Sequence, residues 1–287
     1  MPVPAPPVAA PSAAPGRAAS LEAPERVCLL AITKGGIAKA TRLAQMLPNA
    51  VLCTLDKFAD AIAHLPNPKY ICRKTLREEL GDLFGSFDQF VCFVSLGAVV
   101  RLVAPHLKGK EVDPGVVVVD DAARYVIPML SGHVGGANAW AERVASLLDA
   151  QPVLTTASDA GATIAVDILG RALGWTVQAP KVNLTRVAAA VVNGERIAVV
   201  QDAGSRHWWT RRTPLPANIE VLADMAAVRP GHHRALLWIT HQPVEEALWR
   251  AWPERLIIYR PPEGQQPDDL PADTPVAQRC APVGDGA

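Results

Sequence analysis

Long hydrophobic runs are missing from this sequence of 287 residues. No apolar segment approaches the roughly 20 residues that a membrane-spanning helix needs. The Ala- and Pro-rich start, 1–25, has neither a basic segment nor an unbroken apolar core, so it does not match a secretory signal. We expect disordered tails at 1–25 and at the Pro- and Asp-rich end, 261–287. The folded part is then 26–260, and a cytoplasmic location without membrane contact is expected.

Cysteine is scarce and shows no pairing pattern. The five cysteines include no CxxC pair, and their irregular spacing and odd number argue against a disulfide framework. Reduced thiols are the simpler interpretation. His232, His233 and His241 are close in sequence but belong to no HExxH or Cys/His motif. We therefore expect loop histidines and no bound metal.

Charge of one sign is not in excess, because 28 basic residues balance 28 acidic ones. The two ends together carry three basic and seven acidic residues, which leaves 25 basic and 21 acidic residues in 27–260. Proteins that bind nucleic acid usually show a denser basic stripe. The mild positive balance fits an anionic small molecule better.

Several nucleotide and hydrolase fingerprints are also absent. The sequence has no GxxxxGK[ST] motif, which excludes a P-loop NTPase, and no GxGxxG after a strand, so a dinucleotide site is not supported. It has no GxSxG nucleophile elbow. A nucleotide-binding α/β domain stays open as an alternative, because a fold alone does not decide function.

What is present is an alternation of apolar strands and amphipathic helices. This pattern predicts a mostly parallel sheet with helices on both faces over 26–159 and a second, smaller α/β domain over 160–260. The expected strands are 27–33, 51–54, 90–96, 116–120, 125–130, 152–156, 175–178, 196–201, 235–240 and 255–260. The expected helices are 37–47, 76–84, 99–107, 137–148, 163–173 and 184–192.

Four strand ends carry polar or glycine-rich turns. Ligands of open α/β sheets bind where strands end and helix N-termini begin, because free N–H groups and the helix dipole attract anions there. The four segments are Thr33–Gly36, Ser95–Gly97, Ser131–Asn138 and Thr155–Asp159. Any of them is a candidate for binding an anion.

The richest of these is Ser131–Asn138, Ser-Gly-His-Val-Gly-Gly-Ala-Asn. Its imidazole, from His133, suits general acid–base work near neutral pH. We predict that His133, Ser131 and Asn138 are catalytic. The alternative is a structural turn in which the glycines only bend the chain, Ser131 caps the helix and His133 is a satisfied surface residue.

The remaining candidates are binding residues. Arg101 suits a carboxylate, although a solvated Arg on a helix face explains it equally well. Asp159 is either part of an anion-binding turn or a helix cap. Trp208 and Trp209 either stack on a planar ligand or form a buried pair. The residues expected to bind substrate are Lys34, Gly35, Gly36, Ser95, Gly97, Arg101, Lys108, Gly132, Gly135, Gly136, Thr155, Thr156 and Asp159.

These blocks resemble a known family. Ser95–Pro105, Lys108–Asp120, Ser131–Asn138 and Pro152–Asp159 are similar, in order and spacing, to the N-terminal domain of CbiG, the cobalt-precorrin-5A hydrolase family of cobalamin biosynthesis. Residues 160–260 resemble the central domain of that family, through Asp167, Leu173-Gly-Trp175 and Val192-Asn-Gly-Glu195. The resemblance covers about 230 residues.

The resemblance implies a reaction of the oxygen-independent route to vitamin B12. The δ-lactone of cobalt-precorrin-5A is opened, a two-carbon fragment leaves as acetaldehyde and cobalt-precorrin-5B is formed. The substrate is an anionic tetrapyrrole that carries its own cobalt, so no further cofactor is expected, and a cleft between the two α/β units would suit it. Family members commonly have a further C-terminal domain, which we expect here to be supplied by a separate protein, dispensable or lost. Such a protein, or a precorrin methyltransferase, is the expected partner.

Two hypotheses follow about mechanism. In the first, His133 moves a proton during lactone hydrolysis, while the N–H groups of Gly135 and Gly136 and the side chain of Asn138 stabilise charge on the lactone oxygen. Peripheral carboxylates are held by cations such as Arg101. In the second, the chain is a non-catalytic subunit that binds the corrinoid intermediate and needs a separate C-terminal-domain partner.

Overall fold

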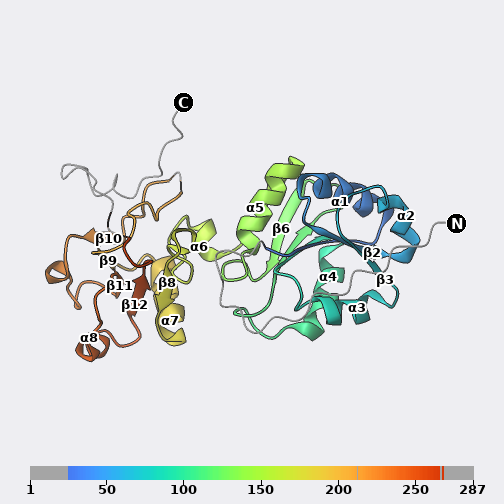
Figure 1. The fold of residues 1–287 in the computed structure, drawn as a ribbon. Helices are drawn as coiled ribbons and strands as arrows, with labels where there is room; N and C mark the ends of the chain where they lie inside the picture. Colours follow the sequence, from blue (N-terminus) through green and yellow to red (C-terminus); the bar gives the residue numbers. More distant parts are fainter. Residues whose placement is uncertain (1–24, 212, 266, 268–287) are drawn as a thin grey trace. The chain divides into compact units, whose positions relative to one another are not determined.

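The computed structural model describes residues 25–211, 213–265 and 267. The chain divides into two compact units between Thr155 and Thr156. Three of the four candidate segments lie in the first unit, and the fourth, Thr155–Asp159, is divided between the two units (Figure 1). Each unit is built around its own sheet, so each has its own core.

The first unit contains a seven-stranded sheet with the order β3-β2-β1-β4-β5-β6-β7. Strands β1 to β5 are parallel, β6 runs antiparallel to β5, and β7 is parallel to β6. We call the edge where β1–β5 end the carboxyl edge and the opposite one the amino edge. The strands are β1 Val27–Ala31, β2 Val51–Leu55, β3 Lys69–Cys72, β4 Gln89–Phe93, β5 Gly115–Val119, β6 Tyr125–Leu130 and β7 Gln151–Pro152.

Helices cover both faces of this sheet (Figure 1). Side chains alternate between the faces of a strand, so Leu29 packs with one group of helices and Leu30 with the other. The first face is covered by α1 Lys34–Met46, α2 Ala59–Ile62 and α5 Ala137–Leu148, and the second by α3 Leu76–Leu83 and α4 Leu96–Val103. Short 3-10 helices, η1 Asp56–Phe58 and η2 Ala104–His106, join these elements.

The second unit contains a five-stranded sheet with the order β10-β9-β11-β12-β8, parallel except for β8. Its two apolar clusters lie on opposite faces, one with α7 and one with α8. The strands are β8 Thr176–Gln178, β9 Ile197–Gln201, β10 Ile219–Leu222, β11 Ala235–Ile239 and β12 Leu256–Arg260. The helices are α6 Ala157–Ala160, α7 Lys181–Val192 and α8 Glu246–Ala251, with 3-10 helices η3 Arg171–Leu173 and η4 Met225–Ala227.

The predicted fold class, mostly parallel sheets with helices, is confirmed in both units. The helix predicted over 163–173 is wrong, because this segment forms turns before η3. The carbonyl of Val166 accepts a hydrogen bond from the Tyr259 hydroxyl at 2.8 Å. Gly170 has a φ of +72°, and a Cβ there would lie 2.0 Å from the Trp175 ring. The apolar spacing that resembles a helix therefore comes from a turn packed on the core.

The strand predicted over 152–156 is shortened to β7, which ends at Pro152. Strands β3 and β10, helices α2, α6 and α8, and the 3-10 helices η1 and η4 have no counterpart in the sequence prediction. The two strands have only four residues each and are mostly half-buried at sheet edges, so neither shows a continuous apolar run.

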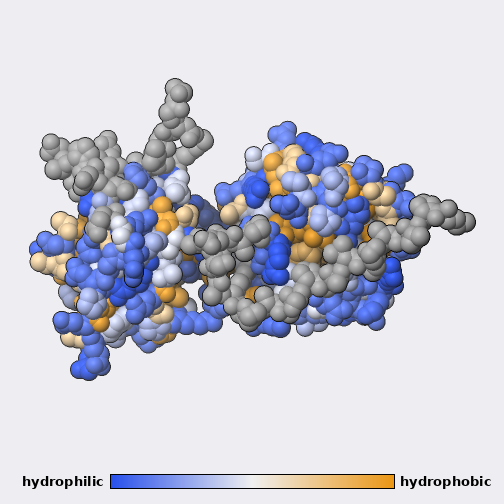
Figure 2. Space-filling view, in the orientation of Figure 1, coloured by the Kyte–Doolittle hydropathy of each residue, from blue (hydrophilic) through white to orange (hydrophobic). Residues whose placement is uncertain are grey.

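Most residues of the expected tails, 1–25 and 261–287, lie outside the described residues. Residues 261–265 are described, and Gln265 accepts hydrogen bonds from Trp175 Nε1 at 2.9 Å and from the Gly204 N–H at 2.8 Å. The visible face of each unit is mostly hydrophilic, with smaller apolar areas (Figure 2). Within the described part of the chain, no helix combines the length and the apolar character needed to cross a membrane.

Candidate functional site

Two of the predicted segments meet at the carboxyl edge of the first sheet. Strands β1 and β4 are neighbours, but the chain continues from β1 to β2 on one side and from β4 to β5 on the other. The loops after them lead to α1 and α4, on opposite faces. Such a reversal is the usual ligand position in open α/β sheets. We call this place the switch point; it contains Thr33–Gly36 and Ser95–Gly97.

The loop after β1 is fixed by a helix cap and by a glycine. The Thr33 hydroxyl accepts a hydrogen bond from the Gly36 N–H at 3.0 Å and caps α1. A Cβ on Gly36 would lie 2.8 Å from the carbonyl oxygen of Phe93, at the end of β4. Glycine is thus needed where α1 meets β4. Lys34 and Gly35 are exposed in the first turn, where helix N–H groups have no partner within the helix.

The loop after β4 presents exposed polar groups. Ser95 is the N-cap of α4, and its side chain makes no capping bond. Ser95 and Gly97 are exposed. Arg101 Nη1 donates to the carbonyl oxygen of Gly97 at 2.7 Å, which places the exposed guanidinium beside the first turn of α4. The structure therefore brings Arg101 to the segment from which it was expected to act.

Two further cations lie at this edge, Arg73 and Lys74, which were not predicted from the sequence. Both are exposed and follow β3, and their backbone N–H groups each donate to Glu79 Oε1 at 2.8 Å. Burial would raise the pKa of Glu79, but the bonds from the Tyr70 hydroxyl and these N–H groups outweigh it and lower the pKa. An ionised Glu79 thus holds the turn that carries them. A prediction of β3 from the sequence would have indicated their position.

An opposite charge also lies close to the switch point. The carboxylate of Asp121, in the loop after β5, lies 3.4 Å from the position that a Cβ on Gly35 would take. Asp121 is exposed, as is Lys34. The carboxyl edge therefore combines four exposed cations, Lys34, Arg73, Lys74 and Arg101, with an exposed aspartate.

The third segment, Ser131–Asn138, lies at the amino edge instead. Strand β6 runs antiparallel to β5, so the turn that follows it returns to the end where the parallel strands begin. Two contacts confirm this position. Gln89 Nε2, at the start of β4, donates to the Gly135 carbonyl at 2.6 Å. A Cβ on Gly115, at the start of β5, would lie 2.8 Å from the same oxygen. We call Ser131–Asn138 the signature turn.

The signature turn satisfies its own backbone. The N–H groups of Gly136, Ala137 and Asn138 donate to the carbonyls of His133, Ser131 and Gly132 at 3.0, 3.2 and 3.0 Å. The Gly136 N–H, expected to stabilise charge on a lactone oxygen, is therefore already bonded.

Its glycines leave room for tight packing. A Cβ on Gly132 would lie 2.5 Å from Asn138 Oδ1, and one on Gly135 would lie 2.3 Å from the Ser131 Cβ. Ser131 has a φ of +53°, a strained conformation for a serine, and its buried hydroxyl has no hydrogen-bond partner among the described residues. His133 is half-buried, and Asn138 is 7% exposed. The three predicted catalytic residues thus share one rigid turn.

The other predicted binding residues are dispersed. Lys108 is exposed in the loop that leads into β5, where its backbone N–H donates to Asp113 Oδ1 at 2.9 Å. Thr155 ends the first unit. Thr156 and Asp159 belong to the second unit, where Thr156 donates to Asp159 and Arg211 Nη2 donates to Asp159 Oδ1 at 2.6 Å. An ion pair within the second unit therefore engages Asp159.

Two further groups have structural roles. Trp208 and Trp209 are 6% and 4% exposed, and their indole N–H groups bond Gln201 Oε1 and the Thr213 carbonyl, so the pair is buried in the core. The cysteines on β1–β4 are free thiols in the core. Burial raises the pKa of Cys92 to about 12, so a thiolate nucleophile is not available there at neutral pH.

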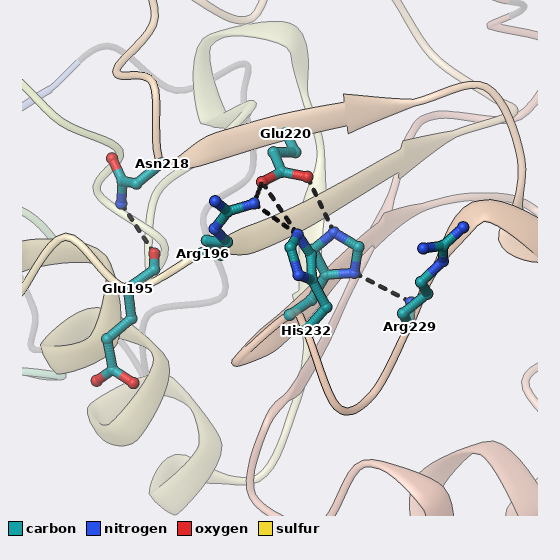
Figure 3. A network of polar contacts seen from close by, with 7 residues as sticks. Glu195, Arg196, Asn218, Glu220, Arg229 and His232 are labelled. Carbon is teal, nitrogen blue, oxygen red and sulfur yellow. Dashed lines mark hydrogen bonds and ion pairs between the residues drawn. The ribbon is translucent and has the colours of Figure 1, made fainter.

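Glu220, His232 and His233 form the one group among the described residues whose ligand atoms are close enough to hold a metal ion, all within 4.8 Å (Figure 3). However, Arg196 Nη1 already lies 3.2 Å from Glu220 Oε1 and 2.6 Å from His232 Nε2.

The protonation of His233 also argues against a metal. Its Nδ1 accepts a hydrogen bond from the Arg229 N–H at 3.0 Å, so in the neutral ring the proton is on Nε2, 3.1 Å from Glu220 Oε2. Nε2 is then a donor to the carboxylate and not a metal ligand. In this cluster Arg196 forms an ion pair with Glu220 and lies where a metal ion would have to bind.

Comparison with known proteins adds the family context. A family model described as Cobalamin synthesis G N-terminal matches residues 78–159, and a model described as Cobalamin biosynthesis central region matches residues 164–261. The first model covers β4, α4, β5, β6 and α5, and so includes both the loop after β4 and the signature turn.

Curated relatives extend the match. A cobalt-precorrin-5A hydrolase from Priestia megaterium is 40% identical over 236 residues, which are 81% of this chain and 62% of the relative. One from Salmonella typhimurium is 33% identical over 180 residues, 63% of this chain and 49% of the relative. This chain therefore spans about half to two thirds of their length. A solved structure of a cobalamin biosynthesis protein G homologue from Sulfolobus solfataricus has a TM-score of 0.45 and 18% identity, covering 82% of this chain and 60% of that one.

Proposed function

Because the chain carries the N-terminal and central regions of the cobalamin synthesis G family and so belongs to it, we propose that it takes part in cobalamin biosynthesis by hydrolysing cobalt-precorrin-5A. The observation that carries this proposal is the 40% identity, over 81% of this chain, to a relative of that name. In this reaction water adds to the lactone carbonyl and the acyl C–O bond breaks, which leaves a carboxylate and an alcohol on the macrocycle. The alcohol then loses its proton and becomes the carbonyl of acetaldehyde as the C–C bond between its carbon and the ring breaks, and the electron pair left on the ring takes up a proton. The cobalt belongs to the substrate, and no other cofactor is invoked. The proposed location is the cytoplasm, in line with the reduced thiols.

The switch point is the proposed binding surface for the anionic macrocycle. Its two helix N-termini, with Lys34 and Arg101, suit peripheral carboxylates, and Arg73 and Lys74 add two further cations along the same carboxyl edge. Leu96 and Val100, one turn apart on α4, are 41% and 47% exposed and offer apolar contact beside Arg101. A substrate with an apolar ring and a charged rim needs both kinds of surface. The rival interpretation, a subunit that binds the intermediate without converting it, uses the same surface.

The signature turn is the proposed source of the proton transfer, through His133. It lies one strand length from the switch point, about 16 Å for five residues, so the two regions cannot contact the same small group of the substrate. They therefore have separable effects: loss of cations raises KM, whereas loss of the imidazole lowers kcat.

The test is acetaldehyde release from cobalt-precorrin-5A by the purified chain, with and without a separate C-terminal-domain protein or a precorrin methyltransferase. We expect His133→Ala to lower kcat by about 100-fold or more, and Lys34→Ala with Arg101→Ala to raise KM. His241→Ala, an exposed histidine of the second unit, is the matched control and keeps the parent turnover. Binding of the coloured substrate without acetaldehyde release under every condition would instead establish the non-catalytic subunit.

A further inference from the structure

Gln89 is a buried polar residue for which the proposed reaction has no direct use. It is the first residue of β4 and is 0% exposed. Its Nε2 donates to the Gly135 carbonyl at 2.6 Å, across 46 residues of sequence. Its Oε1 is buried and has no hydrogen-bond partner among the described residues. A leucine would bury no such oxygen but would remove the donor to the Gly135 carbonyl, so the role of the glutamine is its contact with the turn.

Two glycines make room for this carboxamide, and a third supplies its hydrogen-bond partner. A Cβ on Gly115 would lie 2.0 Å from Gln89 Oε1, and one on Gly136 would lie 3.0 Å from Nε2. Gly135 supplies the carbonyl that the amide binds, and a Cβ on Gly135 would collide with Ser131. The carboxamide and these glycines therefore form one packing unit, to which β4, β5 and the signature turn each contribute.

We infer that Gln89 is a positioning residue: its carboxamide fixes the backbone of the signature turn and so sets the orientation of His133. The inference rests on the proposed function only for its catalytic consequence. The bonded Gly135 carbonyl lies two residues after His133 and four after the strained Ser131, so the hydrogen bond holds the middle of the turn. It adds a contact from β4 to the three N–H bonds that form within the turn.

The first test measures the turn without any substrate. In Gln89→Met, which keeps the length of the side chain and removes the donor, we expect the amides of Gly136, Ala137 and Asn138 to exchange with solvent about tenfold faster. Asn183→Leu is the matched control, because Asn183 is a 3% exposed amide of the second unit that donates to the Leu256 carbonyl at 2.8 Å. It leaves exchange in the turn unchanged. Unchanged exchange in Gln89→Met would overturn the inference.

A second test uses the close approach of Gly115 to the Gln89 carboxamide. Gly115→Ala alone displaces the carboxamide and should loosen the turn as Gln89→Met does. In Gln89→Ala the contact with the carboxamide is gone and only the Gly135 carbonyl oxygen, at 2.8 Å, remains close to the new Cβ, so adding Gly115→Ala should increase exchange less than it does in the parent. Equal effects of Gly115→Ala in both backgrounds would show that the glycine and the glutamine do not act together.

The catalytic consequence is measured separately. If the parent chain releases acetaldehyde, Gln89→Met should lower kcat by up to about 100-fold with little change in KM, and Gln89→Asn should not restore it because its shorter side chain cannot reach Gly135. A looser turn with unchanged kcat would refute the positioning role in catalysis. If the parent chain releases none, the proposed function fails, and the exchange experiments still decide whether Gln89 fixes the turn.

Discussion

Glu220 has a pKa below its ordinary value, mainly because His233 donates a hydrogen bond to it, with further lowering by Arg196 and His232. A carboxyl whose pKa is lower in the folded chain stabilises the fold above its unfolded value, about 4.3. That contribution is lost as the pH falls through the folded value. The second unit should therefore lose part of its stability in acid through this residue.

Replacing Glu220 tests this linkage. We expect Glu220→Gln to lower the urea midpoint of the second unit at about pH 7, and the difference from the parent to shrink towards zero as the pH falls below about 4. Glu246→Gln, which removes an exposed ion pair with Arg250, is the control and should change little at any pH. A midpoint difference that stays constant from neutral to acid would contradict the role of an ionised Glu220.

Gly36 lies where helix α1 packs against the end of strand β4. Gly36→Ala places a Cβ 2.8 Å from a backbone oxygen, which cannot move as a side chain can. We expect a loss of about 1–3 kcal/mol in the free energy of unfolding and weaker substrate binding, because the switch point must shift. Chemical denaturation and KM report the two effects. Gly85→Ala, where no atom lies within 4 Å of the new Cβ, should be close to neutral; equal losses in both variants would contradict the steric explanation.

At the scale of elements, the sequence predicts the strands that are buried on both faces, because β1, β4, β5, β11 and β12 each contain a run of at least four residues that are apolar or aromatic. It also predicts α5 with its observed bounds, Ala137–Leu148. It fails where tertiary packing decides: the apolar residues of 163–173 pack in turns against Trp175 and Tyr259. Local periodicity contains no information about such partners.

The candidate site was predictable in composition but not in arrangement. All four segments follow predicted strands, so the sequence alone predicts that each of them lies at the carboxyl end of a strand. The direction of β6 separates them, because an antiparallel strand sends the signature turn to the amino edge. Gln89 was missed because its partner, Gly135, is 46 residues away. Strand direction and long-range contacts are properties of the folded sheet.

At the scale of the whole molecule, the affinity for the anionic substrate should depend on the salt concentration. The proposed binding surface depends on exposed cations, whose attraction is screened over about 10 Å at 0.1 M salt. We expect KM to rise as NaCl is increased from about 0.05 to 0.5 M, with kcat little affected, in steady-state acetaldehyde assays. The Lys34→Ala, Arg101→Ala double variant should show a flatter dependence. A KM independent of salt would place the macrocycle on a different surface.

The close packing of the signature turn has a consequence for assigning activity across genomes. Gly132 and Gly135 are required because a Cβ would lie 2.5 Å from Asn138 and 2.3 Å from Ser131, and Gly136 is required because its φ is +83°. A protein that had lost the reaction would still need those glycines to fold in this way. Detecting the motif in a new sequence therefore diagnoses the architecture of this turn, and assigning turnover requires a separate measurement.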